Sequence, residues 1–518
     1  MRDVVVVGAG HNALVAACYL ARAGLDVEVV ERRSVVGGAV STVERFGGYR
    51  MDVGSSAHIM VRHTGIIEDL DLAAMGLAYQ DLDPWGFAPF GDEAITFHVD
   101  LDATCASIAQ VCGAQDAEAY REFATTWGKR NLKVFEAFAQ PPTPGRLGRS
   151  LMSIGRGSGV DGIELSRQFL RSGDGLLDEH FTDERLKTAL AWLGAQSGPP
   201  THEVATADLV GWNAVMHHRP PGHPVGGSGM LSVALARRLE QLGGTVRLGD
   251  GCARIATASG RVLGVETDSG DRIPAATVVA GCHVLTTFEL VGWDSLPPAF
   301  AARARSAIRV GNGIGMVVRL ATSALPRYPA GIGGGEWRAL QLLAPSRAML
   351  RQAHADFMSG RPPETPAALA MTFSAFDDTI APPDKHNVTV WGQWHPYELR
   401  TGEHWDDIAE REGHKLVLAV DAAATGFADS VEHMHVQTPL DLERELGLRR
   451  GNVMHVEMSL DQMFAWRPLP ELAGYRTPVE GLYLTGASTH PGGGVFGASG
   501  RSAARVLLGD RRPWWRRR

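Results

Sequence analysis

A glycine-rich turn between a β-branched run and an amphipathic segment constrains the fold of this chain more than any other feature. Asp3 is followed by four valines, and Gly8-Ala9-Gly10-His11-Asn12-Ala13 comes directly after them. The valine run predicts a buried strand, and the apolar spacing of residues 12–23 predicts a helix after the turn. Residues 27–30 are again rich in β-formers. The first thirty residues therefore predict a βαβ unit.

The turn itself points to a nucleotide ligand. Gly8, Gly10 and Ala13 form a G-x-G-x-x-A motif, which lets backbone N–H groups approach a pyrophosphate at the start of a helix. Glu31 ends the second predicted strand, 21 residues beyond Gly10, where a carboxylate accepts hydrogen bonds from ribose hydroxyls. Together these residues predict dinucleotide binding. An acid at position 31 also disfavours the 2′-phosphate of NADP.

Composition narrows the class of protein further. The 518 residues carry a formal net charge of −8, which argues against a nucleic-acid binder that depends on phosphate contacts. The length predicts two to three domains, and no apolar run approaches the roughly 18 residues of a membrane-spanning helix. The opening residues do not resemble a signal peptide. Five cysteines without C-x-x-C spacing predict a reducing compartment, so we expect a cytoplasmic chain.

Strand, glycine turn and helix recur later in the chain. Residues 230–242 predict an amphipathic helix that ends at Gly243-Gly244. Four short β-rich segments follow and predict an antiparallel meander that returns to a buried strand: 245–248, 252–257, 262–267 and 277–280. Near the C-terminus, residues 481–486 predict another buried strand, and a helix is expected from about Ser499 to Leu508.

A glycine doublet distinguishes the type of dinucleotide. Gly37 and Gly38 follow Glu31 closely, with Arg33 between them, and supply a second close-approach turn for a longer dinucleotide. In this segment the chain resembles the flavin amine oxidase and phytoene desaturase superfamily, whose glycine doublet follows the ribose acid in the same way.

The resemblance extends through most of the chain. It rests on four further segments: 46–54, 224–230, 461–468 and 481–501. The last of these, which contains His490-Pro491-Gly492-Gly493-Gly494, resembles the phytoene-desaturase-related branch. That branch includes carotenoid desaturases, ketolases and isomerases and the pyridine nucleotide-disulphide oxidoreductase domain-containing protein 2 type. Ala39 stands where many amine oxidases carry arginine, which argues against an amine oxidase, whereas Cys252 in place of the usual valine is conservative.

The resemblance implies an α/β fold with two interleaved domains. A Rossmann-like FAD-binding domain with a three-layer (ββα) arrangement is expected from residues 1–75, 215–290 and 445–518. An α+β substrate-binding domain is expected from residues 76–214 and 291–444. The implied cofactor is FAD, and the residues expected to bind it are Gly8, Gly10, Ala13, Glu31, Arg33, Gly37, Gly38, Gly54, Cys252, Gly486, Gly493, Gly494 and Val495.

The implied activity is that of a flavin-dependent dehydrogenase, desaturase or oxidase. It would transfer a hydride from an apolar or polyene-like small molecule to flavin N5, with oxygen, a quinone or a carrier as electron acceptor. A redox-neutral isomerase and a non-catalytic escort protein on the same fold are the alternatives. Two histidines are catalytic candidates: His58 as a base, because neutral imidazole accepts a proton near pH 7, and His490, which either faces the flavin or caps a loop.

Four other features carry weaker signals. His433 and His435 share a strand face, but without further ligands no metal site is expected. The glycine clusters at 311–315 and 331–335 are predicted to be packing or loop glycines, because neither lies in a strand–turn–helix unit. Residues 391–397 either line a pocket or pack within a sheet. The tail from Arg511 to Arg518 suits either an anionic membrane surface or a solvated end.

Overall fold

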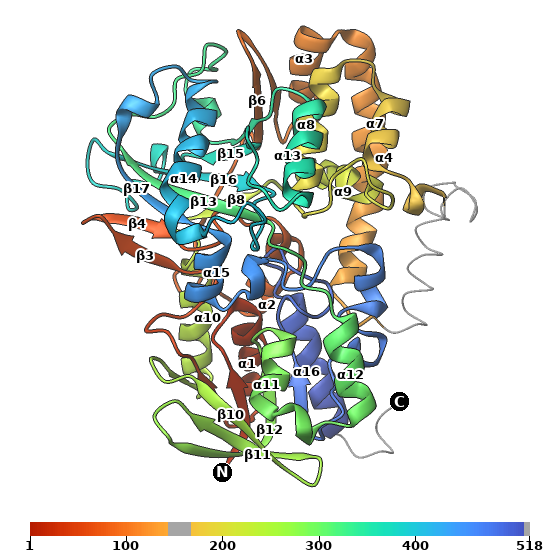
Figure 1. The fold of residues 1–518 in the computed structure, drawn as a ribbon, viewed down its shortest axis with the longest axis vertical. Coiled ribbons are helices and arrows are strands. Elements are labelled where there is room, and N and C mark those ends of the chain that lie inside the picture. The colour runs from red at the N-terminus through yellow and green to blue at the C-terminus, as the bar shows by residue number, and fades with distance from the viewer. Residues whose placement is uncertain (143–166, 512–518) are drawn as a thin grey trace.

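The computed structural model describes residues 1–142 and 167–511 and contains two seven-stranded sheets. In Figure 1 the sheet that contains β1 and β12 lies in the lower half, and the sheet that contains β13, β15 and β16 lies in the upper half. Within the described ranges, no helix has the length and apolarity needed to cross a membrane. Most of the predicted basic tail falls outside them, since the described part ends at Arg511.

The lower sheet has a parallel centre built from both ends and the middle of the chain. Its strands follow the order β10-β11-β12-β1-β2-β9, and β18 pairs with β12. The parallel strands are β1 (Arg2–Val7), β2 (Val27–Val30), β9 (Thr245–Arg247), β12 (Arg272–Ala280) and β18 (Leu482–Leu484). The predicted βαβ unit and the predicted C-terminal strand are therefore present.

Strand β12 joins the meander to the parallel centre. Its first residues pair antiparallel with β11 (Arg261–Thr267), which pairs with β10 (Cys252–Ala258), and residues from Ala275 onward pair parallel with β1. The sequence predicted this strand at residues 277–280, where it lies, but missed its first five residues. Pro274 concealed the continuous strand, because proline in the middle of a strand normally argues against one.

Helices and the meander cover opposite faces of this sheet. Helices α1 (His11–Arg22), α10 (Met230–Gln241) and α16 (Ala498–Arg511) bury their apolar residues on one face. The meander lies toward the other face with α11 (Val284–Val291) and α12 (Pro298–Ala307). A Cβ atom on Gly500 would lie 2.0 Å from the carbonyl oxygen of Asn12, so α16 and α1 cross in close contact. The predicted three-layer Rossmann-like domain is confirmed.

The upper sheet is mixed and follows the order β17-β13-β16-β15-β14-β6-β7. Its strands are β6 (Gly86–Phe90), β7 (Glu93–Phe97), β13 (Gly315–Thr322), β14 (Leu340–Leu343), β15 (Ala368–Met371), β16 (His386–Gln393) and β17 (Val431–Gln437). Helix α14 (Trp405–Asp421) packs on one face. The second, α+β part of the predicted fold is confirmed, whereas the predicted domain boundaries remain a prediction.

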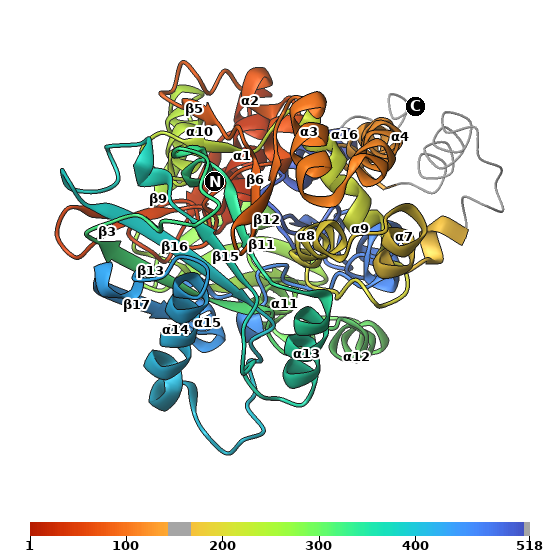
Figure 2. The same cartoon turned by 90° about the horizontal axis from the view of Figure 1, so that it is seen from above.

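A group of helices packs on the other face of the upper sheet (Figures 1 and 2). They are α3 (Leu101–Cys112), α4 (Ala114–Phe138), α7 (Gly173–His180), α8 (Glu184–Ala195), α9 (Ala207–Gly211) and α13 (Arg347–Met358). The other α-helices and strands are α2 (Ile66–Asp69), α15 (Pro439–Leu446), a hairpin of β3 (Thr42–Arg45) with β4 (Tyr49–Asp52), and a long-range antiparallel pair of β5 (Tyr79–Asp81) with β8 (Gly222–Pro224).

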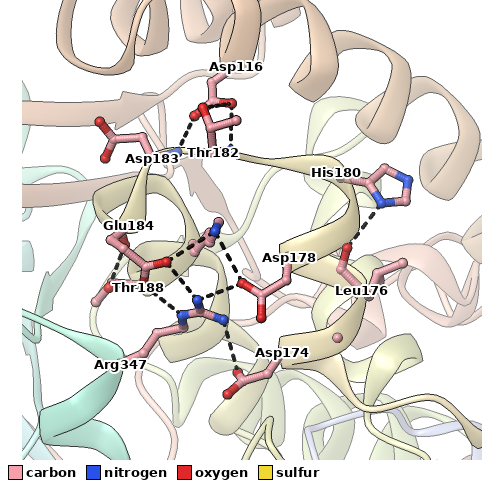
Figure 3. A network of polar contacts seen from close by, with 12 residues as sticks. Asp116, Asp174, Leu176, Asp178, His180, Thr182, Asp183, Glu184, Thr188 and Arg347 are labelled. Carbon is pink, nitrogen blue, oxygen red and sulfur yellow. Dashed lines mark hydrogen bonds and ion pairs between the residues drawn. The ribbon is translucent and has the colours of Figure 1, made fainter.

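A network of charged residues joins three helices of this group, as Figure 3 shows. Arg347 of α13 donates to Asp178 of α7 at 2.7 Å and to Glu184 of α8 at 2.8 and 3.1 Å. Lys187 lies 3.1 Å from both of these carboxylates. The Arg347 side chain is only 8 % exposed, so its charge depends on these partners for compensation.

We predict that Arg347→Met lowers the free energy of unfolding by about 1.5–3 kcal/mol, because it removes the charge-assisted hydrogen bonds of the buried guanidinium and leaves Lys187 as the remaining cation beside the two carboxylates. Chemical denaturation followed by circular dichroism measures the change. Arg121→Met is the matched control, since its ion pair with Asp102 lies at the surface, where ion pairs contribute little to stability. Equal losses in the two variants would show that the network does not stabilise the helices.

Candidate functional site

One large cavity is lined by residues from both halves of the molecule, and its volume is about 1180 Å³. Pockets for a single small ligand measure about 300–1,000 Å³, so this cavity has room for a dinucleotide and a second molecule. All of the residues predicted to bind the cofactor line it: Gly8, Gly10, Ala13, Glu31, Arg33, Gly37, Gly38, Gly54, Cys252, Gly486, Gly493, Gly494 and Val495.

Glu31 organises one end of the cavity. One carboxylate oxygen accepts a hydrogen bond from the backbone N–H of Ala9 at 2.8 Å, and the other accepts one from the N–H of Arg33 at 2.9 Å. The side chain thus ties the glycine turn after β1 to the end of β2. A carboxylate accepts about four hydrogen bonds, so Glu31 retains capacity for the ribose hydroxyls that the sequence assigned to it.

The start of α1 has the geometry of a phosphate site. The helix begins after Gly10, and no acidic residue lies in its first turn. Its first N–H groups have no acceptor within the helix and carry the positive end of the helix dipole. A Cβ atom on Gly10 would meet nothing within 4 Å, so the space in front of the helix is open to the cavity. These residues fit the diphosphate of a dinucleotide.

The glycine doublet closes against the same turn. Gly10 and Gly37 form a parallel β-bridge, and a Cβ atom on Gly37 would lie 2.0 Å from the carbonyl oxygen of Val40. Gly37 is therefore required by the turn itself. Arg33 donates to the carbonyl of Gly38 at 3.1 Å, and burial lowers its pKa. Cys252 is a free thiol at this end, and burial raises its pKa to about 12, so it is neutral.

The loop between β18 and α16 forms a second wall. Gly486, Gly494 and Val495 have positive φ angles of 96°, 109° and 59°, so the loop follows a left-handed path along the cavity. The sequence attributed Gly493 to cofactor contact alone. The structure adds a second reason, because a Cβ atom there would lie 2.4 Å from the Met454 sulfur.

A buried guanidinium lies behind this wall. All the hydrogen-bond acceptors of Arg467 are backbone carbonyls, at 2.6 to 3.2 Å: those of Met454, Val456, Glu457, Gln462 and Ala487. Burial lowers the pKa of Arg467 to about 9, so the group remains a cation at neutral pH. Met454 and Ala487 line the cavity. Arg467 therefore fixes two cavity-lining segments to each other.

The two predicted catalytic histidines do not line the cavity. His58 is fully buried between the cavity-lining residues Ala57 and Ile59, and its ring is hydrogen-bonded to the Tyr79 hydroxyl at 2.7 Å. Burial lowers its pKa to about 3, which makes it a poor base. His490 packs edge-on against Phe138 at 5.7 Å, and burial lowers its pKa to about 4. Neither position supports the predicted role in catalysis.

Three other histidines do line the cavity: His11, His283 and His455. The His283 and His455 rings stack at 5.4 Å, and His455 is hydrogen-bonded to the Ser488 hydroxyl at 3.0 Å. Burial lowers the pKa of His11 and of His283 to about 4 and that of His455 well below its usual value, so all three are neutral at pH 7. His11 lies inside the glycine motif and was detectable there. His283 and His455 lie in no motif.

The remaining part of the cavity is mainly apolar. Its walls come from α4, α8, α9, the 3-10 helix that follows α9 (Trp212–His217) and the facing strands β14, β15 and β16. Representative wall residues are Phe135, Phe138, Leu193, Leu209, Met216, Leu340, Leu369, Met371 and Trp391. Trp391 therefore lines a pocket, which is one of the two roles predicted for residues 391–397. Gln393 and His395 are fully buried and do not line the cavity, so they pack in the protein interior, which corresponds to the other predicted role.

The weaker motifs are also placed. Among residues 1–142 and 167–511, no group of three or more His, Cys, Asp or Glu side chains is arranged to hold a metal ion. The His433 ring stacks on Phe46 at 5.1 Å. A Cβ atom on Gly313 would lie 2.7 Å from the carbonyl oxygen of His395, so this glycine serves close packing, as predicted.

Comparisons with known proteins agree with this geometry. The NAD(P)-binding Rossmann-like domain model matches residues 6–70. Pyridine nucleotide-disulfide oxidoreductase domain-containing protein 2 from Mus musculus is 31% identical over 98% of this chain and 93% of its own length. The chain belongs to this family. The predicted membership of the phytoene desaturase and amine oxidase superfamily of FAD-dependent oxidoreductases is confirmed.

More distant relatives preserve the full length of the fold. Phytoene dehydrogenase from Streptomyces griseus is 27% identical over 98% of this chain and 95% of its own length. The crystal structure of an oxidoreductase from Methanosarcina mazei superposes with a TM-score of 0.64 at 15% identity, covering 98% of this chain and 99% of that one. The two-sheet architecture is thus shared with an oxidoreductase of known structure over almost the whole chain.

We predict that His58→Gln makes stability less sensitive to acid. The folded protein holds His58 neutral down to a pKa of about 3, whereas the unfolded chain takes up a proton near pH 6.5. Stability therefore falls as the pH drops from 6.5 toward 3, by about 1.4 kcal/mol per pH unit for each such histidine.

Removing His58 should reduce this slope by the contribution of about one proton, which is about 1.4 kcal/mol per pH unit. Above pH 7 the substitution should not change how stability depends on pH. Thermal melts between pH 4 and 8 measure the slope, and an unchanged slope would contradict the buried neutral state. His404→Gln is the control, because its side chain is 59 % exposed.

Proposed function

We propose that the protein is an FAD-dependent oxidoreductase that takes a hydride from a C–H bond of an apolar small molecule. The supporting observation is that one cavity joins a dinucleotide-binding end to an apolar part walled by helices and strands. FAD is favoured over NAD because the glycine doublet at Gly37-Gly38 and the loop at Gly493-Gly494 line the same cavity as the first glycine turn. Bound FAD would supply the two-electron acceptor for this chemistry.

The chain's own residues bind and orient this cofactor. The glycine turn and the first N–H groups of α1 bind the diphosphate, and Glu31 accepts hydrogen bonds from the ribose. The loop from Gly493 to Val495, held in place through Arg467, orients the flavin ring. With the cofactor held by these residues, the second molecule would bind in the apolar part of the cavity.

The chemistry requires little acid–base assistance from the chain. The histidines that line the cavity, His11, His283 and His455, are neutral and have pKa values too low for efficient proton uptake near pH 7. The protein therefore acts mainly by orienting the substrate and excluding water. Because the described residues contain one dinucleotide-binding βαβ unit, we propose oxygen, a quinone or a protein carrier as the electron acceptor.

The test begins with the purified protein. We expect a yellow protein that releases one FAD per chain on acid precipitation. Anaerobic addition of an apolar substrate should bleach the bound flavin. FMN in the extract, colour retained in the pellet or a colourless protein that does not bind added FAD would contradict the proposal. A product of unchanged mass would identify the redox-neutral isomerase instead.

We predict that Glu31→Ala weakens FAD binding by about 1.5–3 kcal/mol, the value of a charge-assisted hydrogen bond. It should change turnover at saturating FAD much less, because Glu31 lies at the nucleotide end. Titration of apoprotein with FAD, followed by flavin fluorescence, gives the affinity. Glu44→Ala is the control, since Glu44 lies on β3 and does not line the cavity. Equal affinities of Glu31→Ala and the wild type would remove Glu31 from the site.

A further inference from the structure

Among the residues that the structure describes, one carboxylate lies in the apolar part of the cavity, that of Asp208. Six other charged residues of the described chain line the cavity, and they belong to the nucleotide end or to the segment packed beside it: Glu31, Arg32, Arg33, Asp268, Glu443 and Arg449. The segment that contains Glu443 and Arg449 packs against the nucleotide end, because a Cβ atom on Gly447 would lie 3.1 Å from the Arg32 guanidinium. Asp208 instead belongs to α9, in the helical group of Figure 1.

Asp208 is held by a buried arginine. Arg130 of α4 donates to both carboxylate oxygens of Asp208, at 2.8 and 3.1 Å, and to the Gln168 side chain at 2.8 Å. The guanidinium lies over the rings of Trp127 at 4.4 Å and Phe169 at 4.8 Å. These contacts fix the carboxylate before any ligand arrives.

The carboxylate keeps hydrogen-bonding capacity on the cavity side. The Asp208 side chain is 27 % exposed, whereas that of Arg130 is 4 % exposed. Arg130 supplies two hydrogen bonds, and an ionised carboxylate accepts about four. In an apolar pocket, a small number of polar groups determines the orientation of the ligand. Asp208 therefore selects a ligand that donates a hydrogen bond.

The charge of the pair decides which donor fits. Arg130 and Asp208 together are neutral, so an ammonium group would lose its hydration without gaining a net opposite charge. A hydroxyl group donates one hydrogen bond and carries no charge. An ether or a hydrocarbon end donates none.

The position of the pair separates recognition from reaction. Arg130 precedes Phe135 by five residues on α4, which is about 7.5 Å along the helix axis. The Phe135 ring contacts the Phe496 ring at 6.1 Å, beside the loop that we propose to orient the flavin. The pair of Arg130 and Asp208 thus lies more than one helical turn from the residues beside that loop.

We propose that Asp208, held by Arg130, binds a terminal hydroxyl group of an otherwise apolar substrate, remote from the C–H bond that is oxidised. This inference rests on the proposed function, because it assumes that the apolar part of the cavity is the substrate site. It narrows the substrate class from apolar molecules in general to long apolar alcohols.

The experiment compares three ligands that share one apolar chain. Farnesol, farnesyl methyl ether and farnesylamine are titrated into the FAD-loaded full-length protein by isothermal titration calorimetry. We expect farnesol to bind about ten- to a hundredfold more tightly than the ether, as for one hydrogen bond to a charged group, and more tightly than the amine. Equal affinities for alcohol and ether, tightest binding of the amine or absence of binding by all three would overturn the proposal.

Three variants test whether Asp208 causes the preference for farnesol over its methyl ether. The double variant Arg130→Met/Asp208→Leu replaces the ion pair by apolar side chains, so that no charge is left unpaired, and should bring the ratio of the two affinities close to one. Asp208→Asn keeps one acceptor oxygen and should lower the ratio severalfold, which provides a second reading if the double variant does not fold. Arg121→Met, which removes an exposed ion pair on the same helix, should leave the ratio unchanged.

The outcomes separate this inference from the proposed function. A yellow protein that does not distinguish farnesol from its ether retains the proposed function and loses the hydroxyl site. A protein that binds no FAD but still prefers farnesol, with the preference abolished in the double variant, retains the site and loses the oxidoreductase. A preference that survives in the double variant overturns the assignment to Asp208.

Discussion

The parallel pairing of β1 with β12 is the interaction on which the rest of the structure depends. Val7 pairs with Ala280, so two chain segments separated by more than 270 residues end at the same edge of the sheet. Ala280 also pairs with Leu484 of β18, which brings the C-terminal loop to that edge as well. Ligands of open α/β sheets bind where the carboxyl ends of parallel strands meet. The cavity lies at this edge because all three connections leave the sheet there.

Buried positive charge behind the cavity walls is a second constraint. Arg467 has only carbonyl acceptors, and Arg319 is fully buried with a hydrogen bond to the Thr389 hydroxyl at 3.0 Å. Burial lowers the pKa of Arg319 to about 10, so both groups remain cations at neutral pH. A buried charge is costly without a partner. Ser56, beside Arg319, and Ala487, beside Arg467, line the cavity, so an anionic dinucleotide there would offset part of this cost.

The sequence predicted the nucleotide end of the site well because its geometry is local. Gly8, Gly10 and Gly37 form short turns whose backbone angles depend on adjacent residues, and such turns leave a motif in the sequence. The catalytic predictions depended on side-chain direction, which a motif does not define. His58 lies in a β-bridge, and successive side chains of extended backbone point to opposite sides, so Ala57 and Ile59 face the cavity and His58 does not. Asp208 and His455 reach the cavity through long-range packing and have no local signal.

The distribution of polar groups explains how one cavity holds two different molecules. At the nucleotide end, backbone N–H groups, Glu31 and neutral histidines match a dinucleotide that carries charge and many hydroxyls. Beyond the loop at Gly494, the walls are mainly apolar; Asn131, Gln196 and Ser197 add uncharged polar groups, and the pair of Arg130 and Asp208 adds a dipole without net charge. A charged or highly polar molecule therefore loses more hydration than it regains in this part, whereas an apolar chain loses none. Selection of the second molecule thus depends on the apolar walls, and its direction in the pocket depends on the one charged pair that the described residues place there.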